Sequence, residues 1–496
     1  MIFPDFSEFR RLARRGNVLP VCEVLRADLL TPVGAFLRLE RAGGSYAFLL
    51  ESVEGGERIG RYSFLGCNPP EVIRYGPRGV RLERHGRVEH SGAELFDLLR
   101  RRLAGFRPVR LPGLPPFAGG AIGYLAYDAV RLAERIPATH PDDVGLDDAV
   151  FMLFDGLVAF DHVRQAVWVI RQVFTDGPGS LRAKYNAAVR SIRATRAQLE
   201  RPLEPGRPHA RGGRLRVRSN FSRARFLAAV RRAKGYIRAG DIFQVVLSQR
   251  FSARTAADPL EIYRALRVIN PSPYLYFLRL GDLAVAGSSP EMLVKVEGRD
   301  ALYRPIAGTR PRGRDEREDL RLERELRTDP KERAEHIMLV DLGRNDLGRV
   351  SEYGSVRVDD LMFVERYSHV MHLVSSLRGR LRPEVDCFDV LMACFPAGTL
   401  TGAPKVRAME IIEELEPSRR GIYGGAVLYL DYSGNMDSCI AIRTLVQKGT
   451  TAYIQAGGGI VADSVPQREY EETVNKARAL LTALEEAQGA GGERGH

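Results

Sequence analysis

The chain has 496 residues and a formal net charge of +12; 44% of its residues are hydrophobic and 27% are charged. This length exceeds one ordinary hydrophobic core, so we expect two or more domains. The composition is that of a globular protein, and no apolar run approaches the roughly 18 residues that a transmembrane helix requires. The sequence therefore predicts neither a membrane-spanning protein nor a membrane partner.

The positive charge does not indicate a nucleic-acid partner. Only seven of the 74 basic residues are lysines, and the arginines are spread along the whole chain with acids between them. No basic block alternates with aromatic residues as a stacking platform would. Both coding bias and thermal adaptation would explain so much arginine, and the sequence does not separate the two.

The N-terminal segment and the cysteines indicate a cytoplasmic protein. Residues 1–16 lack the apolar core of a secretory signal. The cysteines are odd in number and lack CxxC spacing, which argues against both a zinc site and a disulfide framework; they are Cys22, Cys67, Cys387, Cys394 and Cys439.

A composition break divides the chain. Strand-like segments such as 46–53 and 149–174 come first, and a helix over about 178–200 follows them. Residues 200–220 are rich in Pro, Gly and Arg and read as a linker. We expect a mainly β N-terminal domain over 1–200, a linker over 201–220, a second domain over 221–485 and a disordered tail over 486–496.

Beyond the break, strands and helices are mixed. A helix is predicted from about Ser222 to Ala239, and short strands and several helices follow it. Because they do not alternate strictly as βαβ units, the fold class is predicted to be α+β.

The stretch "RPIAGTRPRG", residues 304–313, is predicted to be a loop between two strand-like segments. Pro305 fixes its own φ, Gly308 permits conformations that other residues avoid, and Thr309 adds a hydroxyl. Such loops often hold anions with backbone N–H groups. A basic surface turn would have the same composition.

Two acidic helices follow. In "DPKERAEH", Asp329 is the expected N-cap, Pro330 the first helical residue, and Glu332 completes a capping-box pattern. Glu335 lies one turn further along the same face. It is equally well explained as a solvated helix position.

The second acidic helix contains "REYEETVNKARALLTAL". Glu469, Glu472 and Lys476 form one stripe, and a separate apolar stripe contains Ala477, Leu481 and Leu484. A plain amphipathic helix with a Glu472–Lys476 ion pair explains this pattern. Two helices that each offer a pair of carboxylates could also supply the oxygen ligands that Mg²⁺ prefers.

Taken in order, the sequence blocks resemble the chorismate-utilising enzyme family, and within it most closely the large, synthase subunits of anthranilate synthase. The resemblance covers about residues 45–485. The blocks are "FLLESVEGGERIGRYSFLG", "FAGGAIGYLAYD", "GDIFQVVLSQRF", "NPSPYLYFL", "AGSSPEML", "RPIAGTRPRG", "DPKERAEHIMLVDLGRNDLGRV", "YSHVMHLVS", "PAGTLTGAPKVRAMEII", "YGGAVLYLD", "CIAIRTLV" and "IQAGGGIVADSVPQREYEETVNKA".

The resemblance implies a fold of large antiparallel sheets packed with helices, and a Mg²⁺-dependent reaction of chorismate and ammonia that gives anthranilate and pyruvate. It implies that Glu335 and Glu472 bind the metal, with Glu332 and Glu469 as neighbours that act through water. It also implies chorismate contacts at Gly308, Thr309, Tyr423, Arg443, Gly457, Gly458, Gly459 and Lys476. Arg443 could hold a carboxylate bidentately, and the three successive glycines could form an anion-binding nest, although a plain turn is the simpler interpretation of "AGGG" alone.

Four residues are assigned to the catalytic set by the same resemblance. Glu291 would be the general acid that protonates the departing hydroxyl. His372 would assist the elimination of pyruvate, although a histidine in an apolar run is usually a core residue. Gln244 and Thr309 complete the set.

Two positions distinguish sister enzymes. Isochorismate and salicylate synthases have a lysine where this chain has Gln244, and aminodeoxychorismate synthases typically have a lysine where this chain has Ala307. Ammonia is already a nucleophile and needs no lysine to generate it from water. Both positions favour anthranilate as the product.

The resemblance also implies regulation by tryptophan and an amidotransferase partner. The expected tryptophan site contains Leu50, Glu51, Ser52, Asn270, Pro273, Tyr274 and Leu275; Leu275 stands where many relatives have methionine. No "G-x-C-x-G" elbow surrounds a cysteine, so a separate glutamine amidotransferase subunit is expected to supply ammonia in a heterotetramer. The alternatives are an aminodeoxychorismate synthase and a non-catalytic, tryptophan-sensing relative.

Overall fold

A computed structural model describes residues 2–41, 43–52, 60–84, 86–103, 105–203, 215–367 and 370–489. Most of the predicted linker, 204–214, and most of the predicted tail, 490–496, lie outside the described residues. Among the residues described, no helix combines the length and the apolar character needed to cross a bilayer.

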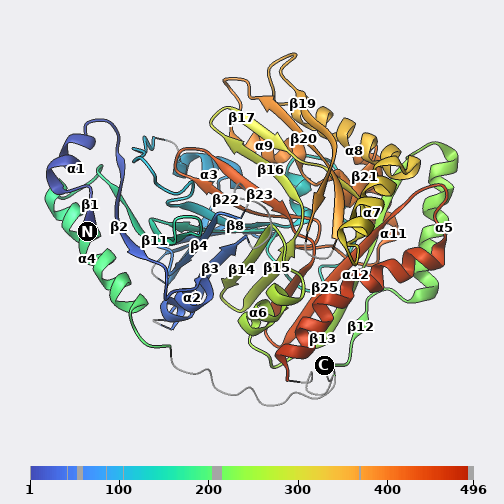
Figure 1. The fold of residues 1–496 in the computed structure, drawn as a ribbon, viewed down its shortest axis with the longest axis horizontal. Helices are drawn as coiled ribbons and strands as arrows, with labels where there is room; N and C mark the ends of the chain where they lie inside the picture. Colours follow the sequence, from blue (N-terminus) through green and yellow to red (C-terminus); the bar gives the residue numbers. More distant parts are fainter. Residues whose placement is uncertain are drawn as a thin grey trace.

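The first of two antiparallel sheets runs the length of the molecule (Figure 1). Its strands follow in the order β1 (Ile2–Phe3), β2 (Val18–Arg26), β11 (Ala166–Phe174), β10 (Gly156–Asp161), β4 (Tyr62–Cys67), β3 (Tyr46–Glu51), β14 (Tyr274–Leu280), β15 (Leu283–Ser289), β24 (Thr444–Lys448), β25 (Thr451–Ile460), β13 (Gln244–Arg254) and β12 (Arg218–Ser219), with β21 (Gly402–Ala403) also paired to β13.

The second sheet carries the loop-like segment 304–313 at one end. Its order is β18 (Ile306–Pro311), β20 (Val370–Arg380), β17 (Asp300–Tyr303), β16 (Met292–Glu297), β23 (Met436–Ile440), β22 (Ala426–Asp431), β8 (Gly120–Leu125), β9 (Ala149–Phe154), β5 (Glu71–Gly76), β6 (Gly79–Arg84) and β7 (Arg87–Ser91), and β19 (Arg357–Arg366) pairs with β20.

Each sheet combines strands from both sides of the predicted linker. In the first sheet β3 pairs with β14, so that Glu51 lies opposite Leu275. In the second sheet β22 pairs with β8. The N-terminal and C-terminal segments are therefore joined by continuous sheet hydrogen bonds, and the two segments expected to bind tryptophan lie on adjacent strands.

A core of large apolar side chains packs between strands of the two sheets. Phe48 of β3 meets Phe154 of β9 edge to face, with ring centroids 4.9 Å apart, and Tyr124 and Trp168 belong to the same cluster. Alternation along antiparallel strands sends one set of side chains inward, which produces this layer.

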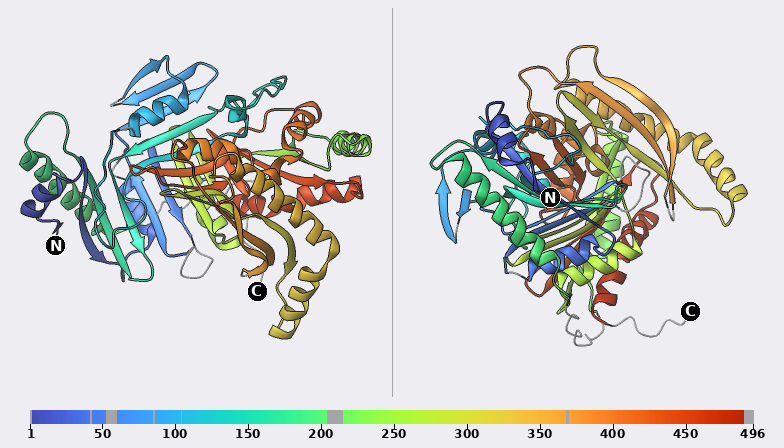
Figure 2. Two further views of the ribbon diagram at one scale, coloured as in Figure 1. Left: turned by 90° about the horizontal axis from the view of Figure 1, so that it is seen from above. Right: turned by 60° about the vertical axis from the view of Figure 1, so that its left-hand side comes forward.

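Helices cover the outer faces. Figure 2 shows α1 and α4 against the sheet at the end where the chain begins. The helices are α1 (Phe6–Leu12), α2 (Pro32–Glu40), α3 (Leu95–Leu103), α4 (Leu181–Leu199), α5 (Arg223–Ala239), α6 (Pro259–Ile269), α7 (Glu316–Thr328), α8 (Pro330–Gly348), α9 (Cys387–Cys394), α10 (Gly398–Thr401), α11 (Lys405–Leu415) and α12 (Pro466–Ala487), with a 3₁₀ turn η1 at Tyr127–Leu132.

The helix starts lie close to those expected from the sequence, and Asp329 is the N-cap predicted for α8. Ser180, Ser222 and Asp329 are the N-caps of α4, α5 and α8, and each side chain accepts a backbone N–H of the first turn. The apolar stripe of α12 is confirmed in part: Ala477 and Leu484 are buried, but Leu481 is only partly buried, and Leu480 and Ala483 are buried instead. With its large antiparallel sheets and packed helices, the fold is α+β as the sequence predicts.

Candidate functional site

The segment 304–313 is largely a strand rather than the predicted loop. β18 pairs with β20 through a register shift between Ala307 and Thr309, which marks a bulge at Gly308. Gly308 has φ +60°, and a Cβ there would stand 2.9 Å from Glu332 Oε2. The bulge lets a stiff, basic segment stay in the sheet, and only glycine suits this position.

His372 lies opposite Thr309 on β20. Its Nδ1 is 3.0 Å from Thr309 Oγ1 and 3.1 Å from the Gly308 carbonyl oxygen. The imidazole therefore makes polar contacts with Gly308 and Thr309, the residues expected to contact the substrate. It is not the apolar core histidine that the surrounding sequence would suggest.

The acidic face of α8 points toward this bulge. Glu332 is held by Arg310, with Oε1 and Nη1 3.1 Å apart, and Arg310 also binds Glu325 and Asp329. Asp329 accepts the N–H groups of Lys331 and Glu332 as a helix cap. Burial, and then repulsion by Glu332, raise the pKa of Glu335 above its usual value.

The acidic face of α12 lies over the glycine segment of β25. The predicted Glu472–Lys476 ion pair is present at 2.6 Å, and Lys476 Nζ donates to the Gly457 carbonyl at 3.0 Å. A Cβ on Gly458 would stand 3.4 Å from Glu469 Oε2 and 3.7 Å from Glu472 Oε1. Burial, ahead of the nearby Glu472 charge, raises the pKa of Glu469.

The donor set suits Mg²⁺ in its chemistry. Glu472 contributes to the raised pKa of Glu335 on the other helix, which means that the two helices present their carboxylates to the same region. Among the described residues, no three acidic, histidine or cysteine side chains are gathered as a ready cluster. Mg²⁺ commonly takes only one or two protein carboxylates together with water and substrate oxygens, so the glutamates on α8 and α12 fit that ion.

The glycine run 457–459 is neither the nest nor the turn suggested by its sequence. These residues lie in β25 without positive φ and pair with Val246, Leu247 and Ser248 of β13. Their backbone therefore takes part in the pairing of β25 with β13. Glycine is required for another reason. A Cβ on Gly457 would stand 2.7 Å from Tyr423 Oη, and a Cβ on Gly459 would stand 2.4 Å from Gln244 Nε2.

Arg443 and Lys476 line one cavity. Arg443 adopts φ +49°, and its Nη1 donates to the Lys476 carbonyl at 3.0 Å. Burial lowers the pKa of Arg443. The cavity has a volume of about 510 Å³ and is lined by Asn270, Arg443, Arg468, Glu471, Glu472, Asn475, Lys476 and Ala479. Its three cations could bind an anionic ligand, and its two carboxylates lie beside them.

Glu291 is buried next to this region. Burial raises its pKa to about 8, while a hydrogen bond from Thr399 Oγ1 at 2.9 Å and the charge of Lys476 partly oppose that rise. A carboxyl with this pKa is protonated at neutral pH and can act as a general acid. Thr399 has no role in the sequence-based hypothesis; the only signal for it was its place in the block "PAGTLTGAPK".

The expected tryptophan residues surround a second cavity of about 850 Å³, except for Asn270. Leu50, Glu51, Ser52, Pro273, Tyr274 and Leu275 line it, whereas Asn270 lines the cavity of Arg443 and Lys476. Ser52 Oγ is buried there, and none of the described residues forms a hydrogen bond with it. The Glu51 carboxylate instead binds Tyr263 at 2.6 Å and Arg267 at 3.1 Å.

Comparisons with known proteins identify the family. The chorismate binding enzyme family matches residues 48–482. The chain is 48% identical to anthranilate synthase component 1 of Acetivibrio thermocellus over 98% of this chain and 99% of that protein. It is 50% identical to the Thermus thermophilus protein of the same name over 95% and 99%.

Two solved structures have a similar fold. Anthranilate synthase component I of Streptococcus pneumoniae superposes with a TM-score of 0.77 at 39% identity, covering 92% of this chain and 98% of that one. The menaquinone-specific isochorismate synthase of Escherichia coli shares the fold, with a TM-score of 0.69 at 20% identity. The chain belongs to the chorismate binding enzyme family.

Proposed function

We propose that the chain is the synthase component of an anthranilate synthase and converts chorismate and ammonia to anthranilate and pyruvate, as the first committed step of tryptophan biosynthesis. The observation that carries this proposal is Glu291. It is a buried acid with a pKa of about 8, within reach of the Lys476 charge, beside a cavity that presents Arg443 and Lys476.

The residues of the chain divide the work. Arg443, Lys476 and the Gly308–Thr309 bulge bind the carboxylates of chorismate. Glu291 gives its proton to the 4-hydroxyl, which leaves as water while ammonia forms a bond to the ring. In the second step the ring loses a proton, the ether bond to the side chain breaks, and anthranilate and pyruvate are released; His372, beside Thr309, assists here.

Glu335 and Glu472 hold Mg²⁺ in this proposal, and Glu332 and Glu469 support it. When bound, the ion neutralises a substrate carboxylate and so favours loss of the hydroxyl. Burial is the main cause of the raised pKa values of Glu335 and Glu469, and repulsion by neighbouring glutamates adds to it. A bound cation would stabilise the charged form of both carboxylates, which supports this assignment.

The partner is a glutamine amidotransferase subunit that releases ammonia. Relatives are named component 1, which fits one member of a two-component enzyme. Assembly as a heterotetramer in the cytoplasm completes the proposal, and the five free thiols suit that reducing compartment.

Tryptophan is the proposed feedback inhibitor and binds in the larger cavity. The Ser52 hydroxyl supports this, since it is buried and has no hydrogen-bond partner among the described residues, so a ligand could supply one. Leu275 and Tyr274 provide apolar walls.

The decisive experiment supplies the purified chain with chorismate, Mg²⁺ and either ammonium salt or glutamine. We expect anthranilate, followed by fluorescence and identified by mass, with ammonium but not with glutamine. A 4-amino-4-deoxychorismate product would favour the sister enzyme of folate synthesis. Absence of any turnover with tight tryptophan binding would favour a sensing protein.

A further inference from the structure

A buried ion pair lies in the connection between α11 and β22. Arg420 and Glu416 form two parallel bonds, Nη2–Oε1 at 2.6 Å and Nε–Oε2 at 2.9 Å. Their side chains are only 1% and 2% exposed. Burying such a pair adds little to stability, because loss of hydration offsets the attraction. Its presence therefore calls for another explanation.

Two further hydrogen bonds of Arg420 reach α10, which contains Thr399, and β13, which contains Gln244. Nη1 donates to the Leu400 carbonyl at 2.7 Å, one residue after Thr399, the partner of Glu291. Nη2 donates to the Val246 carbonyl at 2.7 Å, two residues after Gln244 on β13. One guanidinium thus joins α10 to β13.

Glu416 extends the connection to β25. Its Oε1 accepts Ser248 N at 2.8 Å and Ser248 Oγ at 2.9 Å. Gln455, two residues before Gly457, donates to the same hydroxyl at 2.8 Å. The ion pair therefore also fixes β13 against the glycine segment that lies under α12.

The guanidinium also faces aromatic rings. Its Cζ lies 5.7 Å from the centroid of Tyr423 and 4.7 Å from that of Tyr127. Tyr423 is the ring whose hydroxyl excludes a side chain at Gly457. A cation over a ring face is attracted to it, so Arg420 restrains Tyr423 directly.

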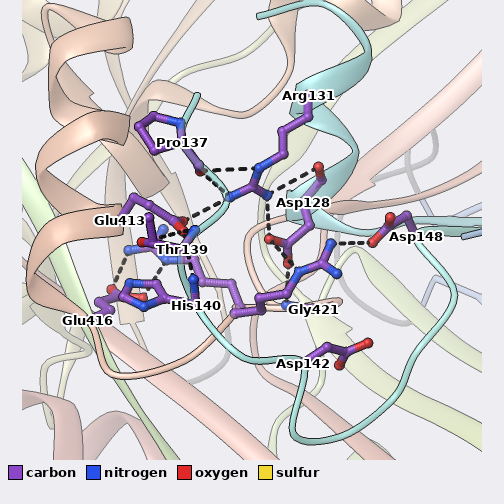
Figure 3. Close-up of polar contacts among 12 residues, drawn as sticks. Asp128, Arg131, Pro137, Thr139, His140, Asp142, Asp148, Glu413, Glu416 and Gly421 are labelled. Carbon is purple, nitrogen blue, oxygen red and sulfur yellow. Dashed lines mark hydrogen bonds and ion pairs between the residues drawn. The ribbon is translucent and has the colours of Figure 1, made fainter. Parts of the chain in front are cut away.

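A second set of polar contacts, drawn in Figure 3, holds the same connection between α11 and β22. Gly421 N donates to Asp128 Oδ2 at 2.9 Å, and Arg419 binds Asp128 and Asp148. Glu413 accepts from Arg131 and from Thr139 N. Asp128 and Arg131 of η1, together with Thr139 after it, thus hold α11 and the connection in place, and this supports Arg420.

We propose that Arg420 and Glu416 are positioning residues for the reaction: together they set the relative places of Glu291, Gln244, Tyr423 and the strand of Gly457. This rests on the proposed function. In this proposal Arg420 and Glu416 do not contact the substrate; they position the residues that do.

The test is the variant Arg420→Lys. Lysine keeps the charge but cannot bridge Glu416, Leu400 and Val246 at once. We expect a folded protein whose kcat falls about 100-fold, the scale of a small misplacement, while KM changes far less. Wild-type kcat in this variant would overturn the proposal.

A double variant separates positioning from folding. Arg420→Met with Glu416→Gln removes both charges, so no uncompensated charge stays buried, whereas Arg420→Met alone leaves one. We expect the double variant to recover thermal stability but not kcat. Recovery of both would make the pair merely structural. The control removes another bidentate pair, Arg61→Met with Asp161→Leu, and should leave kcat within a few-fold.

The pH dependence of kcat/KM distinguishes a positioning role from a merely structural one. Besides the Thr399 hydroxyl, the charged and titratable groups facing Glu291 are Lys476 and Tyr303. If Leu400 shifts, Thr399 loses its bond to Glu291, and that bond lowers the pKa. The alkaline limb of kcat/KM should move to higher pH in Arg420→Lys; an unmoved limb counts against the proposal. If the wild-type chain makes no anthranilate, the proposed function fails instead, and chorismate binding by calorimetry shows whether the site itself is formed.

Discussion

The catalytic region and the larger cavity are built from the same two sheets but differ in how much apolar surface lines them. The catalytic region gathers charges, and their environment displaces the pKa values of Glu291, Glu335 and Glu469. The cavity of Ser52 also contains charged groups, and burial raises the pKa of Asp437 there to about 6, but tyrosines, phenylalanines and aliphatic residues make up much of its wall. The cavity of Arg443 and Lys476 is lined almost wholly by polar and charged side chains. An apolar wall, rather than the absence of charge, therefore distinguishes the region proposed to bind an aromatic ring.

The two regions also differ in where their residues come from. All of the proposed catalytic residues follow the predicted linker, but the larger cavity joins residues 50–52 to residues 273–275 through the β3–β14 pair. They meet at one peptide bond: Met292 lines the cavity, and its neighbour Glu291 is the proposed acid. Glu291 immediately precedes β16 and Met292 begins it, so a shift of this strand end would move both residues.

The largest effect is expected at Glu291. Glu291→Gln removes the proton donor and should lower kcat by about 10²–10⁴-fold. In the wild type the acid form is present below its pKa of about 8 and is lost as pH rises through that value, so kcat/KM should fall above about pH 8. A pH–rate series checks this, and an unchanged alkaline limb in the glutamine variant would contradict it.

The metal assignment predicts the next effect. Glu335→Gln and Glu472→Gln each remove a carboxylate charge and should lower activity by more than about 100-fold, since metal stabilisation of the transition state amounts to several kcal/mol. Asp341→Asn is the control, because Asp341 is an exposed acid further along α8 that pairs with Arg344. Calorimetric Mg²⁺ titration should show weaker binding for the first two. Unchanged Mg²⁺ dependence would leave them as surface acids.

The sequence predicts more of this protein than local patterns usually allow, because many motifs occur in a fixed order. The helix start near Ser222, the N-cap Asp329 and the Glu472–Lys476 pair depend on neighbours in the chain, and all are confirmed. The fold class and family are confirmed as well. The domain division and the roles of the site residues remain predictions.

Long-range packing was beyond the reach of the sequence. The glycines at 457–459 suggest a turn, but they are needed because Tyr423 and Gln244 come close from distant segments. Asn270 stands next to the cavity residues in the chain yet faces the other cavity, since it ends α6 before β14 begins. Arg420 and Glu416 have the spacing of an ordinary surface ion pair, and only the fold buries them.

Blocking the larger cavity should remove inhibition without removing catalysis. Ser52→Arg places a long charged side chain where the hydroxyl now lacks a partner, so tryptophan binding should be lost while uninhibited turnover stays near wild type. Calorimetry and rates with and without tryptophan measure both. Ser52→Ala is the control and should weaken binding only several-fold, the cost of about one hydrogen bond. Full inhibition of Ser52→Arg with undiminished binding would place the effector elsewhere.

The smallest effect, and the most specific, is expected at Met292. Inhibition through a separate site requires that tryptophan and chorismate weaken each other by the same factor, typically about 5–150-fold. If the shared peptide of Met292 and Glu291 carries part of this coupling, Met292→Ala should reduce the factor several-fold while tryptophan still binds, because Ser52, Tyr274 and Leu275 are untouched. Titrating tryptophan with and without chorismate gives the factor directly. A factor equal to that of the wild type would show that the coupling passes instead through the β3–β14–β15 strands, where Tyr274 pairs with Ser289.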